Sequence, residues 1–515
     1  MTIDNSSSKI VRGGLSVGDL LQLLEPFRPL LRGSADQLVV GVQQDSRRVE
    51  RGDLFVARSG GKLDGRQFID AALQRGAAAI LTDGDTSNLV VADAPVICVT
   101  DARRASAYAA EAVLGFPSKK LSLIGITGTN GKTTTVALVE RALVAVGARP
   151  ARLGTTGFAF GSLGHESNLT TPEADEVSRL ISRVVEDNGS HFIMEVSSHA
   201  LDQGRVDALS FDVAGFSNLT QDHLDHHGDM ASYEAAKQRL FTDRTPAKAV
   251  INVDDAAGRR FAGLTRANQL IRVGRSQPCD VQPLDVSMSV QGIRGDIRVD
   301  NTKLRLETRL VGEHNLDNIL LAIGILHALG VELQTAVDGF AGDFGVPGRL
   351  ERCDGMNDDI IALVDYAHTP DALERVLQAV KRFATGSVHC VFGCGGDRDP
   401  NKRPKMGRAV GRWSDRATIT NDNPRTEEPE LIAAAIEPGL SECNIPYRIQ
   451  LDRALAIRDA ILEAAPGDVI VIAGKGHEPY QIVGTTKKPF DDREQARLAL
   501  AIRRTGSEQR KGGCC

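Results

Sequence analysis

A glycine-rich stretch at residues 123–135 constrains the fold of this chain more than any other feature. It reads Leu-Ile-Gly-Ile-Thr-Gly-Thr-Asn-Gly-Lys-Thr-Thr-Thr, which predicts a buried strand, a tight turn and a helix that continues to about residue 147. A turn of this kind cradles phosphate, because backbone N–H groups and the helix dipole both favour an anion. Lys132 supplies a charge for the β and γ phosphates, and the hydroxyl of Thr133 or Thr134 can hold Mg²⁺. Ile126 occupies the position of the first glycine of the strict Walker spacing, but the flanking strand and helix favour a phosphate cradle over an ordinary turn.

The composition limits the class of protein. With 515 residues, 42% of them hydrophobic, the chain can bury several cores, and its length favours about three domains. A net charge of -6 argues against a nucleic-acid partner. No apolar run reaches the ~18 residues of a membrane span, and the polar N-terminus does not resemble a signal peptide. We therefore expect a cytoplasmic protein with reduced cysteines that binds neither membrane nor nucleic acid, and we expect a monomer.

The order of predicted elements indicates an α/β fold of three domains. Short apolar strands alternate with helices in residues 1–117, and Pro117 marks a break before the glycine-rich strand. A central domain with the phosphate cradle covers residues 118–345, including short alternating strands at 268–310 that suit antiparallel pairing. Strands and helices alternate again in residues 346–505, which predicts a Rossmann-like parallel sheet with ligands at the carboxyl ends of its strands. We expect a disordered tail at residues 506–515.

Two groups of polar residues in the central domain suggest catalysis. Glu195 ends the apolar run 192–194, where a phosphate site needs a metal ligand or a water-holding acid; a surface glutamate at a strand end is the less favoured interpretation. The segment 222–227 reads Asp-His-Leu-Asp-His-His, and a helix carrying Lys237 follows it. Zinc is disfavoured because no cysteine accompanies the histidines. Magnesium with few protein ligands suits a nearby polyphosphate better.

Three polar segments follow predicted strands of the C-terminal domain, at residues 393–399, 421–425 and 474–478. Because the carboxyl ends of parallel strands meet at one edge of a sheet, we expect the three segments to lie together. Arginine forks bind carboxylates, and Glu478 suits an ammonium, so the segments predict a site for a zwitterion. Helix capping and surface ion pairs would explain single residues here, but not three such segments at one edge.

Taken together, these motifs resemble the Mur ligase family, the ATP-dependent amide-forming enzymes of peptidoglycan synthesis, from about residue 41 to residue 504. The resemblance is greatest to the branch that adds the third amino acid to UDP-N-acetylmuramoyl-L-alanyl-D-glutamate. The matching segments are residues 45–47, 52–57, 128–134, 194–199, 222–225, 233–237, 364–370, 422–425 and 474–478. Two positions depart from the pattern of that branch: Leu169 replaces an asparagine, and residues 312–315 read Gly-Glu-His-Asn.

The resemblance implies roles for individual residues. It makes Lys132, Glu195, His223 and Lys237 catalytic. It implies that ATP contacts Gly128, Thr129, Asn130, Gly131, Lys132, Thr133, Thr134, Asn315, Arg349, Asp365 and His368. Gln44, Ser46, Gly61, Lys62 and Leu63 would bind the uridine part of the sugar nucleotide, and Thr170, Thr171, Ser197, Gln203 and Arg205 would bind its muramoyl dipeptide. Arg398, Asp422, Asn423, Pro424, Arg425, Gly474 and Glu478 would bind the incoming amino acid. The magnesium ligands or their neighbours would be Thr133, Glu195, His223 and Lys237, the last as a carbamate (N6-carboxylysine).

The resemblance also implies the activity. A ligase of this branch uses ATP and Mg²⁺ to add meso-diaminopimelate to the UDP-muramoyl dipeptide through an acyl phosphate, in cell-wall biogenesis, and so supports cell shape and division. Residues 1–117 would then bind the UDP-substrate and residues 346–505 the amino acid. Three alternatives remain: a lysine-adding member of the family, a folylpolyglutamate synthetase-like ligase, and a paralogue that binds ATP without ligating. The residues at 45–47 and 422–425 disfavour the second, and intact Lys132, Glu195, His223 and Lys237 disfavour the third.

Overall fold

The computed structural model describes residues 14–59, 64–84, 94–165, 167, 169–276, 278–289, 292–341, 348–355 and 358–512. The chain forms two compact units. Unit 1 comprises Met1–Gly128, Val146–Ser217 and His223–Arg272, and unit 2 comprises Thr129–Ala145, Asn218–Asp222 and Val273–Cys515. The chain passes from unit 1 to unit 2 inside the glycine-rich loop, between Gly128 and Thr129. Both units are built of α/β layers, as the sequence predicts.

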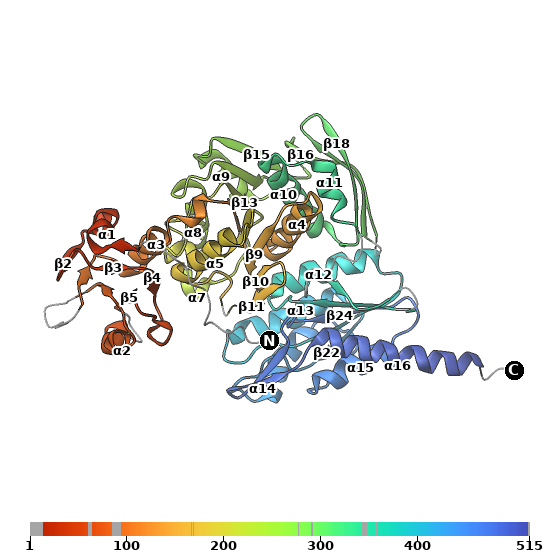
Figure 1. The fold of residues 1–515 in the computed structure, drawn as a ribbon. Helices are drawn as coiled ribbons and strands as arrows, with labels where there is room; N and C mark the ends of the chain where they lie inside the picture. Colours follow the sequence, from red (N-terminus) through yellow and green to blue (C-terminus); the bar gives the residue numbers. More distant parts are fainter. Residues whose placement is uncertain are drawn as a thin grey trace. The chain divides into compact units, whose positions relative to one another are not determined.

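The N-terminal part of unit 1 is a five-stranded sheet in the order β2-β7-β6-β5-β4. Its strands are β2 (Leu30–Arg32), β4 (Gly41–Gln43), β5 (Asp53–Ala57), β6 (Ala79–Thr82) and β7 (Val96–Cys98). All neighbours pair in parallel except β2, which is antiparallel to β7. Helices α1 (Val17–Leu23), α2 (Ile69–Gln74) and α3 (Ala102–Val113) accompany it (Figure 1). Separate apolar clusters cover the two faces, which explains why the strands read as continuous apolar runs.

The second sheet of unit 1 contains the strand that leads into the glycine-rich loop. Its order is β11-β10-β9-β12-β8-β13-β14-β15. The strands are β8 (Ser122–Thr127), β9 (Pro150–Gly154), β10 (Gly157–Phe160), β11 (Leu163–His165), β12 (His191–Glu195), β13 (Val213–Phe216), β14 (Lys248–Asn252) and β15 (Gln269–Val273). The helices are α5 (Ala174–Glu186), α6 (Ser198–Asp202), α7 (Leu224–His227), α8 (Met230–Thr242) and α9 (Ala256–Leu264). Because β8 pairs in parallel with both β12 and β13, Glu195 at the end of β12 lies next to the end of β8.

Unit 2 begins with α4 (Lys132–Ala145), which contacts α10 (Glu313–Leu329) and α11 (Leu333–Asp338). The strands β16 (Val281–Ser289), β17 (Gly292–Val299) and β18 (Thr302–Thr308) form an antiparallel meander. This confirms the antiparallel pairing expected from the alternating pattern. At the start of the region, however, Val273 pairs with Val281 in parallel.

The C-terminal part of unit 2 is a six-stranded sheet in the order β19-β20-β24-β21-β22-β23. Its strands are β19 (Glu351–Arg352), β20 (Ile361–Asp365), β21 (Val388–Phe392), β22 (Arg416–Ile419), β23 (Tyr447–Ile449) and β24 (Val469–Ala473). The helices are α12 (Pro370–Phe383), α13 (Arg403–Trp413), α14 (Pro429–Ser441), α15 (Arg453–Glu463) and α16 (Asp492–Gly512), and β25 (Tyr480–Val483) with β26 (Thr486–Pro489) forms a hairpin. One core packs α12, α13 and α14 on one face, and a second packs α15 and α16 on the other. The sheet is therefore doubly wound, as expected (Figure 1).

The helix α16 continues to Gly512, into the segment from residue 506 for which we expect disorder, and that expectation stays a prediction. Residues 507–511 read Ser-Glu-Gln-Arg-Lys, which are mostly good helix formers and can extend a helix that is already anchored. Cys514 and Cys515 lie outside the described residues. Among helices in the described ranges, none combines the length and apolar character needed to cross a bilayer.

Candidate active site

The glycine-rich loop has the bend that its sequence predicts. Gly128 and Gly131 adopt positive φ values of 147° and 88°. A Cβ atom at residue 131 would collide with the side-chain oxygen of Asn318, so glycine is required there by space as well as by conformation. After the loop, Thr133 and Thr134 are buried in the first turn of α4. The loop therefore ends at a helix N-terminus, as a phosphate cradle needs.

Asn218 organises the start of this loop. Its backbone oxygen accepts from the Thr129 N–H at 2.8 Å, and its side-chain oxygen accepts from the Asn130 N–H at 3.0 Å. Its amide also donates to the Asn130 oxygen at 3.1 Å. The sequence predicts that backbone donors of the loop face a phosphate, but in this structure those of Thr129 and Asn130 serve Asn218 instead. We therefore expect a phosphate to meet donors of later residues, at the start of α4.

Unit 2 brings further charge to the start of α4. The Lys132 ammonium donates to the Thr129 oxygen at 2.9 Å, so the side chain folds back over its own loop. The Arg349 guanidinium donates to the Thr133 hydroxyl at 3.4 Å and lies 4.7 Å from the centre of the Tyr366 ring. Two cationic side chains, predicted from distant parts of the sequence, therefore lie at one helix N-terminus.

The other residues predicted to bind ATP, Asn315, Asp365 and His368, form hydrogen bonds with residues near the glycine-rich loop or near Arg349. Asn315 is buried and accepts from the Asn318 amide at 3.2 Å, and Asn318 in turn lies against Gly131. Asp365 is buried and accepts the N–H groups of Leu350 at 2.6 Å and Ala367 at 2.7 Å. Burial raises the pKa of Asp365. His368 contacts the Tyr366 oxygen through Nδ1 at 2.9 Å. In this structure Asp365 thus fixes the backbone beside Arg349.

Glu195 lies at a buried position in unit 1, with 1% of its surface exposed. One carboxylate oxygen accepts the Thr155 N–H at 2.8 Å, and the other accepts the Thr155 hydroxyl at 3.2 Å. A Cβ atom at Gly154 would collide with this carboxylate. A buried acid of this kind is a metal-ligand candidate rather than a surface glutamate.

The residues predicted to bind the muramoyl dipeptide form one connected group beside Glu195. The Thr171 hydroxyl donates to the Glu195 backbone oxygen at 2.8 Å and lies 3.2 Å from the Ser197 hydroxyl. Arg205 donates to the Thr171 oxygen and to the Gln203 side chain, both at 2.7 Å. Thr170 joins through Thr155, with their hydroxyls 3.3 Å apart. The structure therefore brings these predicted residues together, although they come from separate segments.

The histidines form a second cluster in unit 1. The ring of His199 lies 4.8 Å from His223, 4.1 Å from His226 and 5.5 Å from His227, centre to centre. Burial, helped by these neighbours, lowers the pKa of His199 to about 4. His227 lies 3.0 Å from the Ser198 hydroxyl. In the described ranges no three His, Cys, Asp or Glu side chains are arranged to hold a metal by themselves.

Lys237 is buried on α8, with 1% of its surface exposed. Its ammonium donates to the Gly128 oxygen at 2.8 Å and lies 4.5 Å from the centre of the Tyr233 ring. The predicted modified lysine thus contacts the first glycine of the phosphate cradle. The contact shown is that of the unmodified ammonium, so the carbamate stays a prediction.

The three polar segments of the C-terminal sheet meet, as predicted. They follow β21, β22 and β24, and β21 pairs in parallel with both other strands. The Asn423 amide donates to a Glu478 oxygen at 3.0 Å, and Lys475 donates to the Asn423 oxygen at 3.1 Å and to Glu478 at 3.0 Å. Lys475 is fully buried. These contacts join segments that are more than fifty residues apart in the chain.

Arg425 crosses from one segment to another. Its guanidinium donates to the Gly396 oxygen at 2.6 Å, and its backbone N–H donates to the Ile482 oxygen at 3.1 Å. Arg398 is exposed on the same loop as Gly396. Asp422 and Pro424 are buried, and Gly474 has no room for a Cβ because Asp422 lies against it. All the predicted amino-acid residues therefore belong to one edge of the sheet.

The uridine residues are only partly described. The Gln44 amide donates to Asp175 at 2.9 Å, and Ser46 begins a short 3-10 helix that Asp45 caps. Gly61, Lys62 and Leu63 lie outside the described residues, so their predicted role stays a prediction.

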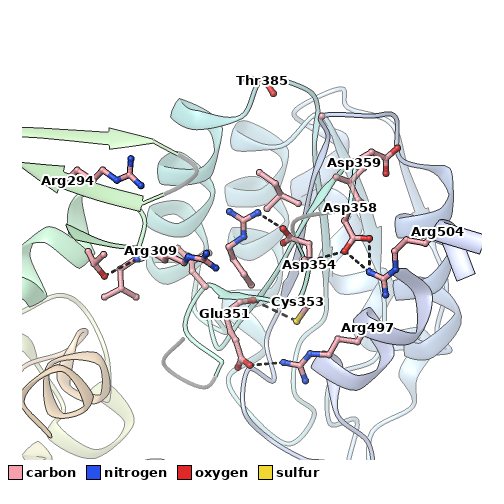
Figure 2. Close-up of a pocket in the computed structure, with 18 of the residues that line it drawn as sticks. Arg294, Arg309, Glu351, Cys353, Asp354, Asp358, Asp359, Thr385, Arg497 and Arg504 are labelled. Carbon is pink, nitrogen blue, oxygen red and sulfur yellow. Dashed lines mark hydrogen bonds and ion pairs between the residues drawn. The ribbon is translucent and has the colours of Figure 1, made fainter. Parts of the chain in front are cut away.

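A separate cavity of about 1260 Å³ lies in unit 2, and none of the predicted residues lines it. Its charges are largely matched: Arg504 pairs with Asp358, Arg497 with Glu351, and Arg352 with Asp354 (Figure 2). A charge-balanced cavity of this kind gives no preference for an anion or a cation.

Sequence reasoning missed several residues that support the site. Asn218 holds the backbone of Asn130, and Thr155 holds the Glu195 carboxylate, each from a distant part of the chain. Asn318 donates to Asn315 on the same helix and lies against Gly131. Lys475 belongs to the predicted segment 474–478, but the sequence does not predict a role for its charge. The structure shows that its ammonium donates to both Asn423 and Glu478.

Family models match most of the chain in three segments. A model of the Mur ligase family catalytic domain matches residues 38–115, one of the Mur ligase middle domain matches residues 126–326, and one of the glutamate ligase domain of Mur ligases matches residues 348–476. The chain belongs to the Mur ligase family. The fold and motifs described above agree with this membership.

Individual proteins narrow the comparison. The UDP-N-acetylmuramoyl-L-alanyl-D-glutamate--2,6-diaminopimelate ligase of Gloeobacter violaceus is 45% identical over 92% of this chain and 96% of its own length. A solved structure of a ligase with the same name is 32% identical, with a TM-score of 0.69, and covers 95% of this chain and 99% of its own. A folylpolyglutamate synthase of Mycobacterium tuberculosis is 18% identical with a TM-score of 0.58 over 72% of this chain and 91% of its own, and so shares the fold alone.

Proposed function

We propose that this Mur ligase adds meso-diaminopimelate to UDP-N-acetylmuramoyl-L-alanyl-D-glutamate with hydrolysis of ATP, and so makes a tripeptide precursor of peptidoglycan. The choice of diaminopimelate as the added amino acid rests on one observation, the hydrogen-bond network of Asn423, Lys475 and Glu478 in the segments that also hold Arg425. It offers an amide and a guanidinium for carboxylates and an acid for an ammonium at one sheet edge. Relatives that are 41% to 45% identical bear the name of that ligase.

The nucleotide half of the reaction belongs to the glycine-rich loop. Lys132, the start of α4 and Arg349 supply positive charge for the γ phosphate of ATP. The γ-carboxylate of the D-glutamate attacks the γ phosphorus, the bond to the bridging oxygen breaks, and ADP leaves. This yields an acyl phosphate, a mixed anhydride whose carbonyl is activated toward attack by an amine. The dipeptide that carries this carboxylate would be held by the connected group of unit 1, which is Thr170, Thr171, Ser197, Gln203 and Arg205.

The second half is acyl transfer. An amine of diaminopimelate attacks the acyl carbonyl, and the tetrahedral intermediate expels inorganic phosphate while the nitrogen loses a proton. Glu478 would bind an ammonium of the amino acid, and Arg425 and Arg398 its carboxylates. Burial of the supporting groups, such as Lys475, keeps these donors and acceptors in place before the substrate arrives.

The residues present fit magnesium. Mg²⁺ takes few protein ligands and keeps water and substrate oxygens, so the buried Glu195 carboxylate and the Thr133 hydroxyl are each donors of a suitable kind, although the described residues contain no dense ligand cluster. We assign Glu195, His223 and Lys237, as a carbamate, to the same role. Bound magnesium would neutralise charge on the transferring phosphoryl group.

We propose a division of binding among the three predicted domains: residues 1–117 for the UDP-substrate, 118–345 for ATP and 346–505 for the amino acid. Cell-wall precursors of this kind carry a polar sugar nucleotide, and the chain has the composition of a cytoplasmic protein, so we propose a cytoplasmic monomer that binds small-molecule substrates.

Phosphate release tests the proposal. Purified protein with ATP and Mg²⁺ should release phosphate only when both the UDP-muramoyl dipeptide and diaminopimelate are present. Hydroxylamine added without the amino acid should trap the acyl phosphate as a hydroxamate of the dipeptide. Phosphate release that is independent of the dipeptide, or no release at all, would overturn the proposal; release with a folate in place of the dipeptide would favour a folylpolyglutamate synthetase-like ligase.

A further inference from the structure

An arginine that the sequence motifs do not include lies beneath the amino-acid site. Arg453, the first residue of α15, has a side chain with no exposed surface. Its guanidinium donates to Asp492 through Nε and Nη2, each at 2.7 Å, in a two-pronged ion pair. Asp492, the first residue of α16, is equally buried. A charged pair this deep needs every donor and acceptor satisfied.

The remaining hydrogen bonds of this guanidinium reach the two loops of the amino-acid site. Nη1 donates to the Asn421 oxygen at 3.1 Å, and Nη2 donates to the Ala473 oxygen at 3.0 Å. Asn421 directly precedes Asp422, and Ala473 directly precedes Gly474. One planar group therefore holds the starting points of the segments 421–425 and 474–478.

The geometry leaves little freedom between these two loops. Asp422 packs against Gly474 so closely that a Cβ on residue 474 would collide with it, and Arg453 lies within 3.9 Å of the same point. Beyond these starting points, Asn423 meets Glu478 at 3.0 Å. A shift of either loop at its root would change that distance, and a displacement of about 1 Å in a binding group can cost a hundredfold in rate.

We propose that the Arg453–Asp492 pair is a positioning device that sets the affinity for the incoming amino acid by fixing the spacing of Asn423 and Glu478. The inference rests on the proposed function, because the proposed function assigns the segments 421–425 and 474–478 to binding of the amino acid. Arg453 itself touches no substrate in this account. A lysine cannot replace it, since an ammonium lacks the fixed fork that bonds one carboxylate and two carbonyls at once.

A purely structural role is the competing explanation, and Arg503 provides the matched control. Arg503 lies on α16 and also donates to an aspartate with two prongs, Asp359 at 2.7 and 2.9 Å. It also donates to main-chain oxygens, those of Ile461 at 2.9 Å and Leu462 at 3.3 Å. None of these partners belongs to the segments 421–425 or 474–478. Arg503→Lys therefore removes a similar fork without touching the amino-acid loops.

The experiment compares Arg453→Lys, Arg503→Lys and the unchanged protein in the phosphate-release assay, with diaminopimelate, ATP and the UDP-muramoyl dipeptide varied in turn. For Arg453→Lys we expect the KM of diaminopimelate to rise about tenfold to hundredfold, and the KM of ATP to stay within about twofold. Arg503→Lys should leave all three KM values unchanged. Calorimetric titration of diaminopimelate into each protein with a non-hydrolysable ATP analogue should repeat the pattern in Kd.

Each outcome has one meaning. Equal KM values for diaminopimelate in Arg453→Lys and Arg503→Lys, in folded proteins, would overturn the inference and leave the proposed function standing. A rise in all three KM values together would also overturn it, because a general loss of structure explains that result. If the unchanged protein neither ligates nor binds diaminopimelate, the proposed function fails and the inference with it. If Arg453→Lys does not fold, Asp492→Asn replaces it, because asparagine keeps the shape of the acid. The same comparison of the KM of diaminopimelate with that of Arg503→Lys then decides the outcome.

Discussion

The amide of Asn423 donates to the carboxylate of Glu478 at 3.0 Å, across a gap of 55 residues in the chain. The Asn423 oxygen is already used twice, by the Lys475 ammonium at 3.1 Å and by the Ile482 N–H at 2.9 Å. Its two acceptor sites are thus filled, and Asn423 can meet a ligand only as a donor. Lys475 therefore fixes the orientation of the amide, which favours a carboxylate as the group that Asn423 recognises.

Arg425 should select diaminopimelate over lysine. Arg425→Ala removes a guanidinium that suits the distal carboxylate of diaminopimelate, which lysine lacks. Loss of one charge-assisted contact costs about 1.5 to 3 kcal/mol, or roughly 10- to 150-fold in the KM of diaminopimelate. Arg408→Ala is the control, because Arg408 forms an exposed fork with Glu442 in the same sheet domain. An unchanged KM in Arg425→Ala would show that the assignment is wrong.

Lys237 should act as a carbamate. A free ammonium would be repelled by bound Mg²⁺, whereas its adduct with CO₂ is an anion with oxygen ligands. We expect Lys237→Ala to be inactive and to regain part of its activity when short-chain carboxylic acids are added to the buffer. Recovery with alkylamines instead would favour the ammonium that donates to the Gly128 oxygen in this structure.

Asn218 should control the affinity for ATP. Asn218→Ala removes the side chain that pairs with both the N–H and the oxygen of Asn130, and so loosens the start of the phosphate cradle. We expect the KM of ATP to rise about tenfold, which corresponds to about 1.4 kcal/mol, with the KM of diaminopimelate unchanged. Asn218→Asp keeps the acceptor for the Asn130 N–H and should give a smaller rise. Equal effects on both substrates would argue for a general loss of structure.

Asp53 should make the N-terminal sheet less stable as the pH rises. Burial raises the pKa of Asp53 from an ordinary value of 3.8 to about 6. Between these values the folded protein holds a proton that the unfolded chain has lost, so stability falls across this range and is constant above it. The loss amounts to about 3 kcal/mol.

The variant Asp53→Asn removes this titration but keeps an acceptor for the Glu50 N–H, which donates to Asp53 at 2.8 Å. Urea unfolding of both proteins at about pH 4 and about pH 7.5 should show that the variant gains stability relative to the unchanged protein only at the higher pH. A gain of the same size at both pH values would contradict the raised pKa.

The strands, and the loops that follow them, could be predicted because their signals are local. The apolar runs before Glu195 and Asp422 identify buried strands, and parallel pairing then brings the ends of those strands together without any knowledge of side-chain contacts. This is why the segments at 393–399, 421–425 and 474–478 were expected at one edge.

The supporting residues could not be predicted, because their signals are not local. Asn218 serves a loop 88 residues earlier, and Arg453 meets Asp492 39 residues later. An asparagine after a strand or an arginine at a helix start has many ordinary uses, and only the folded chain shows its partner. The short edge strand β23 was missed for a related reason, since three residues carry too little pattern.

The central claim is that the amino acid added is diaminopimelate, and competition between amino acids tests it most directly. The purified protein is supplied with ATP, Mg²⁺, the UDP-muramoyl dipeptide and equal concentrations of meso-diaminopimelate and L-lysine, and the two products are separated by mass. The account predicts that the diaminopimelate product exceeds the lysine product by about 10- to 150-fold, the value of the Arg425 contact. Equal amounts of the two products, or an excess of the lysine product, would contradict it.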